Sequence, residues 1–335
     1  MNTGLKITAF AAAVAATFGT AYGVGQAVDP VTDRAPTAGH GAHDGDRRVA
    51  EKTGGEEDGA PAHGGAAAGG LQISERGYTL DLKTSRVAAD RREELRFAVV
   101  KDSTGRNVTA YQKEHDKELH LIVASRDLTV YRHLHPTRAA DGTWSTKVEL
   151  PEAGGYRVFA DFRPEGAEEG LTLGADLAVA GESAPKKLPA HGTTATVDGY
   201  DVTLKGELKT GRGGDLTLNV AKNGRPVTDL QPYLGAYGHL VALRSGDLAY
   251  LHVHPNGEPG DGRTKAGPGV SFTATAPSAG AYRLFLDFKH EGKVRTAAFT
   301  VHAAGGDERA EKGEQGEKAE KGGSEHGEKD GGHQH

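Results

Sequence analysis

The 335-residue sequence contains no cysteine, and its single methionine is the first residue. These absences exclude disulfides, iron–sulfur clusters, thiol catalysis and every metal site that depends on Cys or Met ligands. They also exclude a bacterial lipoprotein anchor, which needs a cysteine at the processed N-terminus. The sequence has 16 histidines instead, so a site for a transition metal must use imidazole, carboxylate or backbone ligands.

Neither sign of charge dominates the sequence, because 40 Lys and Arg residues stand against 46 Asp and Glu residues, for a net charge of −6. It has no basic cluster of the kind that phosphate contacts need, so we predict no nucleic-acid partner. The motifs of phosphate loops, serine hydrolases and zinc proteases are missing as well. We therefore predict that the protein is not an enzyme.

Aromatic residues are nearly absent from the two ends of the chain. Of 9 Phe, 10 Tyr and 1 Trp, only Phe10, Phe18 and Tyr22 lie outside residues 71–303. Segments without large apolar side chains cannot offset the entropy lost on ordering. We therefore predict a disordered linker over residues 29–70 and a disordered tail rich in Glu, Lys, Gly and His over residues 304–335.

Residues 1–28 have the order of an export signal, with a short cationic start followed by an uncharged stretch from Ile7 to Val28. The stretch is also long enough to span a bilayer, which takes about 20 apolar residues. A cleaved signal peptide and an uncleaved membrane anchor both remain open. Either one places the rest of the chain outside the cytoplasm, secreted or anchored to the membrane.

The central residues contain one pattern twice. His133-Leu-His135-Pro recurs as His252-Val-His254-Pro, and the segment from Ala153 to Phe159 recurs from Ala279 to Phe285. We predict two domains, over residues 71–181 and 195–303, joined by a linker over residues 182–194.

Each copy reads as short strands with alternating apolar and polar residues, as in Tyr78–Leu82 and Trp144–Leu150. About seven such strands per copy predict an all-β fold of two tandem immunoglobulin-like β-sandwich domains. Tyr156 and Tyr282 follow the pattern Pro-x-Ala-Gly-x-Tyr before a strand, which is typical of a tyrosine corner.

Histidines in the same spacing occur once in each copy. The six residues are His120, His133 and His135 in the first copy, and His239, His252 and His254 in the second. A two-residue hairpin turn at Arg126-Asp127 or Ser245-Gly246 would place His120 opposite His133, and His239 opposite His252. The third histidine of each set lies two residues further along and returns to the same face. The pattern predicts a nitrogen-ligated metal site in each copy.

Asp161 and Asp287 occupy equivalent positions on a later strand. Each is a candidate for a fourth ligand or for a group that orients a ligand. Cu(II) is the favoured ion, and imidazole also suits Zn(II) and Ni(II). In the alternative interpretation the histidines are structural and pack with Tyr131 and Tyr250.

Four further central histidines have no counterpart in the other copy, and we interpret them as ordinary exposed residues: His115, His191, His290 and His302.

The second copy, with Leu230-Gln-Pro-Tyr-Leu-Gly-Ala-Tyr-Gly-His239 followed by His252-Val-His254-Pro, resembles exported bacterial β-sandwich domains of the YtkA-like type. The resemblance implies an exported protein of tandem immunoglobulin-like domains that handles copper. Relatives that shuttle Cu(I) often use methionine, which is missing here, so the resemblance favours Cu(II) on histidine.

Three functions stay open at this stage. The first is an exported Cu(II)-binding protein for buffering or tolerance, with the metal ion as its partner. The second is a tethered cell-surface interaction module, whose partner is a membrane or cell-surface protein and whose histidines are structural. The third and weakest is a metalloenzyme, by analogy with the His-x-His of cupins and copper–zinc dismutases.

Overall fold

The computed structural model describes residues 68–251 and 253–304. The predicted export signal, nearly all of the predicted linker 29–70 and the tail after residue 304 lie outside the described residues, as does His252. Within the described ranges no helix has the length and apolarity that a membrane span needs.

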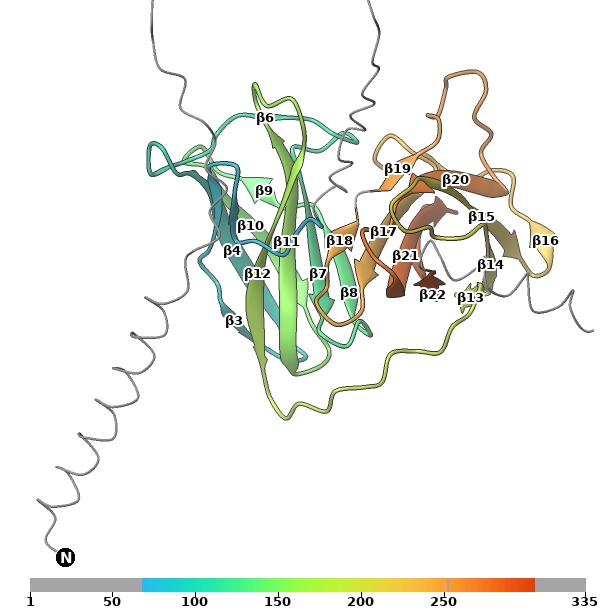
Figure 1. The fold of residues 1–335 in the computed structure, drawn as a ribbon, viewed down its shortest axis with the longest axis horizontal. Helices are drawn as coiled ribbons and strands as arrows, with labels where there is room; N and C mark the ends of the chain where they lie inside the picture. The colour runs from blue at the N-terminus through green and yellow to red at the C-terminus, as the bar shows by residue number, and fades with distance from the viewer. Residues whose placement is uncertain (1–67, 252, 305–335) are drawn as a thin grey trace, which may run out of the picture. The chain divides into compact units, whose positions relative to one another are not determined.

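The first sandwich consists of two sheets (Figure 1). One sheet has the strand order β1-β2-β4-β10-β9 with β5 beside β4, and its strands are β1 (Ser74–Glu75), β2 (Tyr78–Leu82), β4 (Arg92–Lys101), β5 (Arg106–Asn107), β9 (Thr137–Arg138) and β10 (Thr143–Glu149). The other has the order β3-β12-β11-β7-β8 with β6 beside β11, and its strands are β3 (Arg86–Ala88), β6 (Tyr111–Gln112), β7 (Leu119–Ser125), β8 (Tyr131–Leu134), β11 (Gly154–Pro164) and β12 (Leu171–Ala180).

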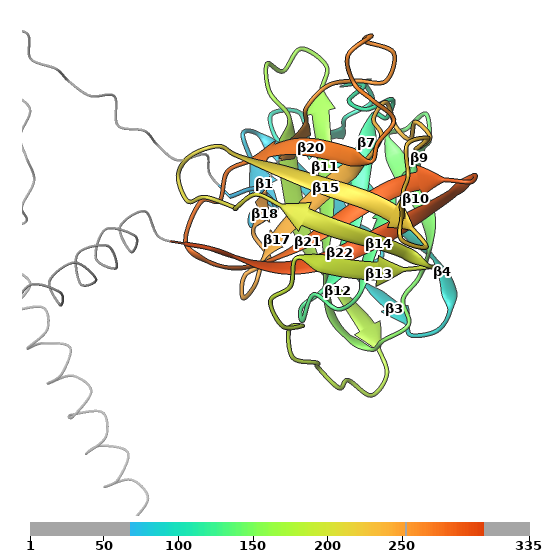
Figure 2. The ribbon, with the colours of Figure 1, turned by 90° about the vertical axis from the view of Figure 1, so that its right-hand side faces the viewer.

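The second sandwich repeats this plan. One sheet has the order β13-β14-β15-β20-β19 with β16 beside β15, and its strands are β13 (Thr194–Val197), β14 (Tyr200–Lys205), β15 (Gly214–Lys222), β16 (Arg225–Pro226), β19 (Val253–Pro255) and β20 (Gly269–Ala274). The other has the order β18-β17-β21-β22, and its strands are β17 (His239–Arg244), β18 (Tyr250–Leu251), β21 (Gly280–His290) and β22 (Lys293–Ala303). Figure 2 shows β14 and β15 in front of β21 and β22.

This strand order confirms the predicted all-β fold of two tandem immunoglobulin-like sandwiches. The antiparallel neighbours β2, β4, β10 and β9 correspond to strands A, B, E and D of that fold, and β7, β11 and β12 to C, F and G. Both tyrosine corners are present. The Tyr156 hydroxyl donates to the Glu152 carbonyl at 2.7 Å, and the Tyr282 hydroxyl donates to the Ser278 carbonyl at 2.7 Å.

The strands that correspond to C and F are buried on both faces. On β7, Leu119, Leu121 and Val123 belong to the core of the first sandwich, whereas Ile122 and Ala124 point to the opposite face. On that opposite face they join a third apolar cluster that contains side chains of both sandwiches. The two sandwiches therefore share buried surface, a feature that strand alternation alone does not predict.

The shared apolar cluster is built from equivalent positions of the two copies. Its buried members are Ile122, Ala124, Leu128, Tyr131 and Phe159 from the first copy, and Val241, Leu243, Leu248, Tyr250 and Phe285 from the second. The Tyr131 and Phe285 rings stack with their centroids 4.1 Å apart. We call this set the shared cluster.

The last residues of the predicted N-terminal linker are part of the fold. The Gly69 amide donates to the Tyr250 carbonyl of the second sandwich at 3.2 Å, and the Gly70 amide donates to the Thr172 carbonyl of the first at 2.8 Å. Arg157 donates to the carbonyls of Gly70 and Leu71. A Cβ atom at position 174 would collide with the Gly70 carbonyl, so glycine is required there.

The predicted hairpin register is wrong by two residues in both copies. Ile122 lies opposite His133, and Ala242 lies opposite Leu251. The connection is a four-residue loop, in which Leu128 and Leu248 adopt positive φ angles of 59° and 63° and bury their side chains in the shared cluster. A shift of two residues keeps each side chain on its predicted face, because strand side chains alternate with a period of two.

Candidate metal centre

His120 is the second residue of β7 and His239 the first residue of β17, and the two lie in equivalent surroundings. His120 Nε2 donates to the Glu114 carbonyl at 3.0 Å, and His239 Nε2 donates to the Tyr233 carbonyl at 2.8 Å. Because a carbonyl oxygen can only accept, Nε2 carries the proton in both rings. In the neutral imidazole, Nδ1 of each ring then presents a lone pair.

His133 is held by a carboxylate of the second sandwich. Its Nδ1 donates to Asp287 Oδ2 at 2.8 Å, and both side chains are buried, with exposed fractions of 7% and 3%. The same carboxylate also accepts the hydroxyls of Thr296 and Tyr131. A neutral His133 therefore presents its Nε2 lone pair, which lies 3.1 Å from Nδ1 of His120.

His135 supplies a third nitrogen. Its Nε2 is buried and has no hydrogen-bond partner among the described residues. A buried polar atom without a partner costs about 1–3 kcal/mol. A cation at this nitrogen would remove that cost.

The three rings lie at distances that suit one shared ion. Each of His120, His133 and His135 contributes one ring nitrogen, and these three nitrogens all lie within 4.8 Å of one another. The ring centroids are 5.3, 5.4 and 4.9 Å apart. With metal–nitrogen bonds of about 2.1 Å, two imidazoles on a tetrahedral ion have centroids about 5 Å apart.

Burial keeps His120 and His135 uncharged near neutral pH. It lowers the pKa of His120 from 6.5 to about 4, with a further contribution from the neighbouring His133. It also lowers the pKa of His135 from 6.5 to about 3, and again His133 contributes. Neutral imidazole is the form that binds a metal, so the site is ready for a cation at pH 7.

The site adjoins a cavity of about 40 Å³ lined by histidines of both copies, among them His115, His120, His133 and His239. A cavity needs about 10–15 Å³ to hold one ordered water, so this cavity has room for an ion. Burial lowers the pKa of His239 to about 4.

A family described as "Domain of unknown function (DUF8832)" matches the sequence over residues 73–177 and again over 195–305. The chain belongs to the DUF8832 family. No curated protein matches it.

The solved structures that match the DUF8832 chain include bacterial proteins and titin domains, all at low sequence identity. The D0–D1 domain of intimin is 12% identical with a TM-score of 0.19, over 68% of this chain and 97% of that one. InvD of Yersinia pseudotuberculosis is 13% identical with a TM-score of 0.24, over 69% of this chain and 58% of that one. Domains 5–6 of the S-layer protein SbsC are 11% identical with a TM-score of 0.21, over 68% and 97%. At such TM-scores these likenesses carry no weight for function.

In the second DUF8832 copy the strand that corresponds to β8 ends earlier. Strand β18 ends at Leu251, and the chain then crosses to the other sheet, where the backbone of His254 pairs with Thr273. His252 lies outside the described residues. Of the second set, the described side chain that adjoins the first set is that of His239, with ring centroids 6.2 Å from His120 and 6.1 Å from His133.

The two predicted aspartates lie opposite the predicted histidines, although Asp287 acts across copies. In the ladders, Asp161 pairs with His120 and Asp287 pairs with His239. Asp287 bonds to His133 of the other DUF8832 copy. Asp161 accepts the hydroxyls of Thr172 and Tyr250 instead.

His115 is a functional candidate that we interpreted from sequence as an isolated exposed residue. It is exposed, yet its ring lies 5.1 Å from that of His239 and 6.2 Å from that of His120. It occupies a tight turn with Asp116, both at positive φ, next to the equivalent turn of the second copy at Gly235. The equivalent position in the second copy is Leu234, so the repeat gave no reason to single out His115. Its place beside the site depends on contact between the copies, which the repeat does not predict.

The other three histidines without counterparts stay away from this site. Our interpretation of His290 as exposed is wrong, since the side chain is buried. Hydrogen bonds to Tyr200 and Asp229 satisfy its two nitrogens there. His191 and His302 form an exposed pair with their Nδ1 atoms 3.5 Å apart.

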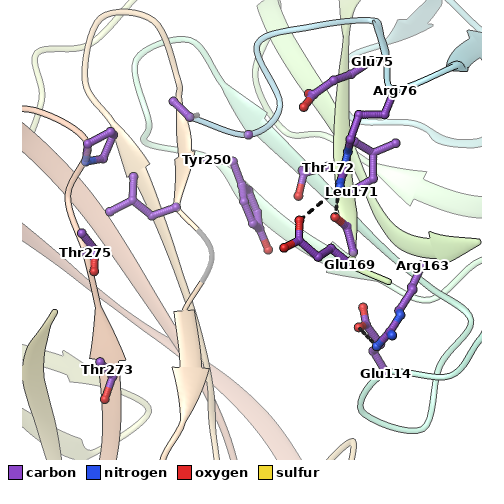
Figure 3. A pocket seen from close by; sticks show the side chains of 15 residues that line it. Glu75, Arg76, Glu114, Arg163, Glu169, Leu171, Thr172, Tyr250, Thr273 and Thr275 are labelled. Atoms are coloured by element: carbon purple, nitrogen blue, oxygen red, sulfur yellow. Dashed lines mark hydrogen bonds and ion pairs between the residues drawn. The ribbon is translucent and has the colours of Figure 1, made fainter. Parts of the chain in front are cut away.

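A larger cavity of about 780 Å³ lies between the two DUF8832 copies and is drawn in Figure 3. Four of its five charged side chains form two ion pairs, Arg76 with Glu169 at 3.3 Å and Arg163 with Glu114 at 3.9 Å. Thr273 and Thr275 lie on the opposite wall, with Tyr250 between (Figure 3). Most of the charges that line it are thus paired, and the histidine site offers the stronger chemistry.

Proposed function

We propose that the protein is an exported, histidine-ligated metal-binding protein that takes one divalent transition-metal ion at His120, His133 and His135. Cu(II) is the favoured ion, with Zn(II) and Ni(II) as competitors, because the ligand set is all imidazole. A buffering or tolerance role fits such a site, and no catalytic step is assigned to it.

One observation carries the proposal. His120 Nδ1 and His133 Nε2 lie 3.1 Å apart, and each of these rings spends its N–H on another acceptor. Two lone pairs at this distance repel each other unless a cation or a proton lies between them. His135 supplies a nitrogen to the same set, and its buried Nε2 has no partner among the described residues.

The test is a titration of the purified full chain with Cu(II) and Zn(II) against a competing chelator, which discounts loose binding by other histidines. His133→Asn keeps a donor near the position of Nδ1 for Asp287 and removes Nε2. We expect tight binding of one ion to the native chain and a loss of at least about 100-fold in affinity for His133→Asn combined with His135→Phe.

The matched control replaces the exposed pair, with His191→Ala and His302→Ala, and should bind like the native chain. Equal affinity of the native chain and the His133→Asn/His135→Phe variant would refute the proposal.

A second candidate is a tethered immunoglobulin-like interaction module with structural histidines. The bond between His133 and Asp287 supports it, because this pair joins the two sandwiches without any metal. The contact of 3.1 Å between His120 Nδ1 and His133 Nε2 would then be a hydrogen bond between the two rings. This candidate expects no tight metal binding and no effect of chelators on the binding of a surface partner.

A further inference from the structure

We propose that the ion is held jointly by both DUF8832 copies, with His239 as a further ligand and Asp287 as the residue that positions His133. This inference rests on the proposed function and adds to it that metal binding cross-links the two sandwiches.

The first step concerns Asp287. Histidine ligands commonly donate their second N–H to a carboxylate, which fixes the ring and raises its basicity. Asp287 does this for His133 from the other copy, at 2.8 Å and in a buried setting. The hydroxyls of Thr296 and Tyr131 fix the carboxylate in turn.

The second step concerns His239. Its Nε2–H is committed to the Tyr233 carbonyl, and the hydrogen bonds found among the described residues leave Nδ1 without a partner. Two imidazoles on one ion have ring centroids between about 4.5 Å, for ligands at a right angle, and about 6.4 Å, for opposite ligands. The distances of 6.2 and 6.1 Å from His239 to His120 and His133 lie at the upper end of this range. The set of nitrogens within 4.8 Å of one another holds the first-copy histidines alone, so the proposal requires the His239 ring to move toward the ion on binding.

The third step is the contrast with Asp161, the equivalent aspartate of the first copy. Asp161 also faces a histidine across its ladder and also accepts a threonine and a tyrosine hydroxyl. Among the described residues it receives no hydrogen bond from a histidine. The two aspartates thus accept from equivalent hydroxyls, but Asp287 is buried and Asp161 is half-buried. The residue equivalent to His133 in the second copy is His252, which lies outside the described residues, so Asp287 makes the described contact between a carboxylate and a histidine of the other copy.

The experiment compares three single variants of the full chain. Asp287→Asn and His239→Gln should each weaken Zn(II) binding by about 10- to 100-fold in chelator competition, whereas Asp161→Asn should stay within about threefold of the native chain. His239→Gln keeps a donor for the Tyr233 carbonyl and removes Nδ1, so a loss of affinity reports the ligand rather than the fold.

The absorption spectrum of the Co(II)-loaded chain separates the two roles. Loss of a ligand in His239→Gln should change the position and intensity of the visible bands. Asp287→Asn should keep the band shape at a higher cobalt concentration, because its ligand set is intact. Near-UV circular dichroism establishes that each variant is folded.

The outcomes distinguish the two proposals. If the native chain binds no ion tightly, the proposed function itself fails. If it binds, and the His133→Asn/His135→Phe variant loses the ion while Asp287→Asn and His239→Gln bind like Asp161→Asn, then the cross-link is overturned and the metal site of the first copy stands.

Discussion

The two copies share a spacing of histidines but differ in the course of the chain after the hairpin. In the first copy β8 continues through His133 to Leu134, so that the histidines stay beside His120. In the second copy β18 ends at Leu251, and β19 joins the opposite sheet. The first copy gathers its three histidines, and of the second set the described side chain of His239 lies beside them.

The difference also shows what the second copy supplies. It places Asp287 and His239 against the histidines of the first copy, while the equivalent Asp161 bonds to Tyr250.

The largest effect is expected from the truncation of a side chain in the shared cluster, which tests how far the two copies depend on each other. Phe285→Ala removes a ring that is 3% exposed and stacked on Tyr131 of the other copy. We expect the free energy of unfolding of the metal-free chain to fall by about 3–5 kcal/mol, measured by urea denaturation. A fall of less than about 1 kcal/mol would mean that the copies are stable without their shared surface.

The next largest effect is the loss of stability in acid that the buried histidines cause. The pKa values of His120 and His239 are lowered from 6.5 to about 4, and that of His135 to about 3. The unfolded chain therefore binds more protons than the folded chain between these values and 6.5, so that stability is full above pH 6.5 and falls as the pH drops toward 4.

For the metal-free chain this fall should exceed about 1.4 kcal/mol per pH unit near pH 5, the slope for one proton taken up on unfolding. Urea denaturation at a series of pH values measures it. The variant His120→Gln should show a shallower slope, and an unchanged slope would assign the pH dependence to other groups.

The smallest effect is expected from the residue that distinguishes the two turns. His115→Leu introduces the residue of the second copy, Leu234, at an exposed site where both residues have positive φ. Stability should change by less than about 0.5 kcal/mol, as for most surface substitutions. Zn(II) affinity should fall by a few-fold, which would place His115 at the edge of the site; no change in affinity would remove it.

The sequence predicted the parts of this structure that depend on local pattern. Alternation along the strands placed His120 and His133 on one face, and the motif before Tyr156 and Tyr282 predicted two tyrosine corners, both confirmed. These features follow from a period of two and from short-range hydrogen bonds.

The sequence could not predict the register or the contact between the copies. The register depends on a loop in which Leu128 takes a positive φ, a conformation that leucine seldom adopts and that burial in the shared cluster stabilises. Apolar residues such as Ile122 and Val241 on the outer faces indicated burial but not against which surface. The partnership of Asp287 with His133 depends on that surface, so spacing within one copy could not reveal it.

The attachment of Gly69 and Gly70 has a mechanical consequence. Gly69 pairs with the second sandwich and Gly70 with the first. Arg157 donates hydrogen bonds to the carbonyls of Gly70 and Leu71. A force that pulls on the chain before residue 68 therefore reaches both sandwiches at their junction. The load is divided at the point of entry instead of passing through one sandwich to the other.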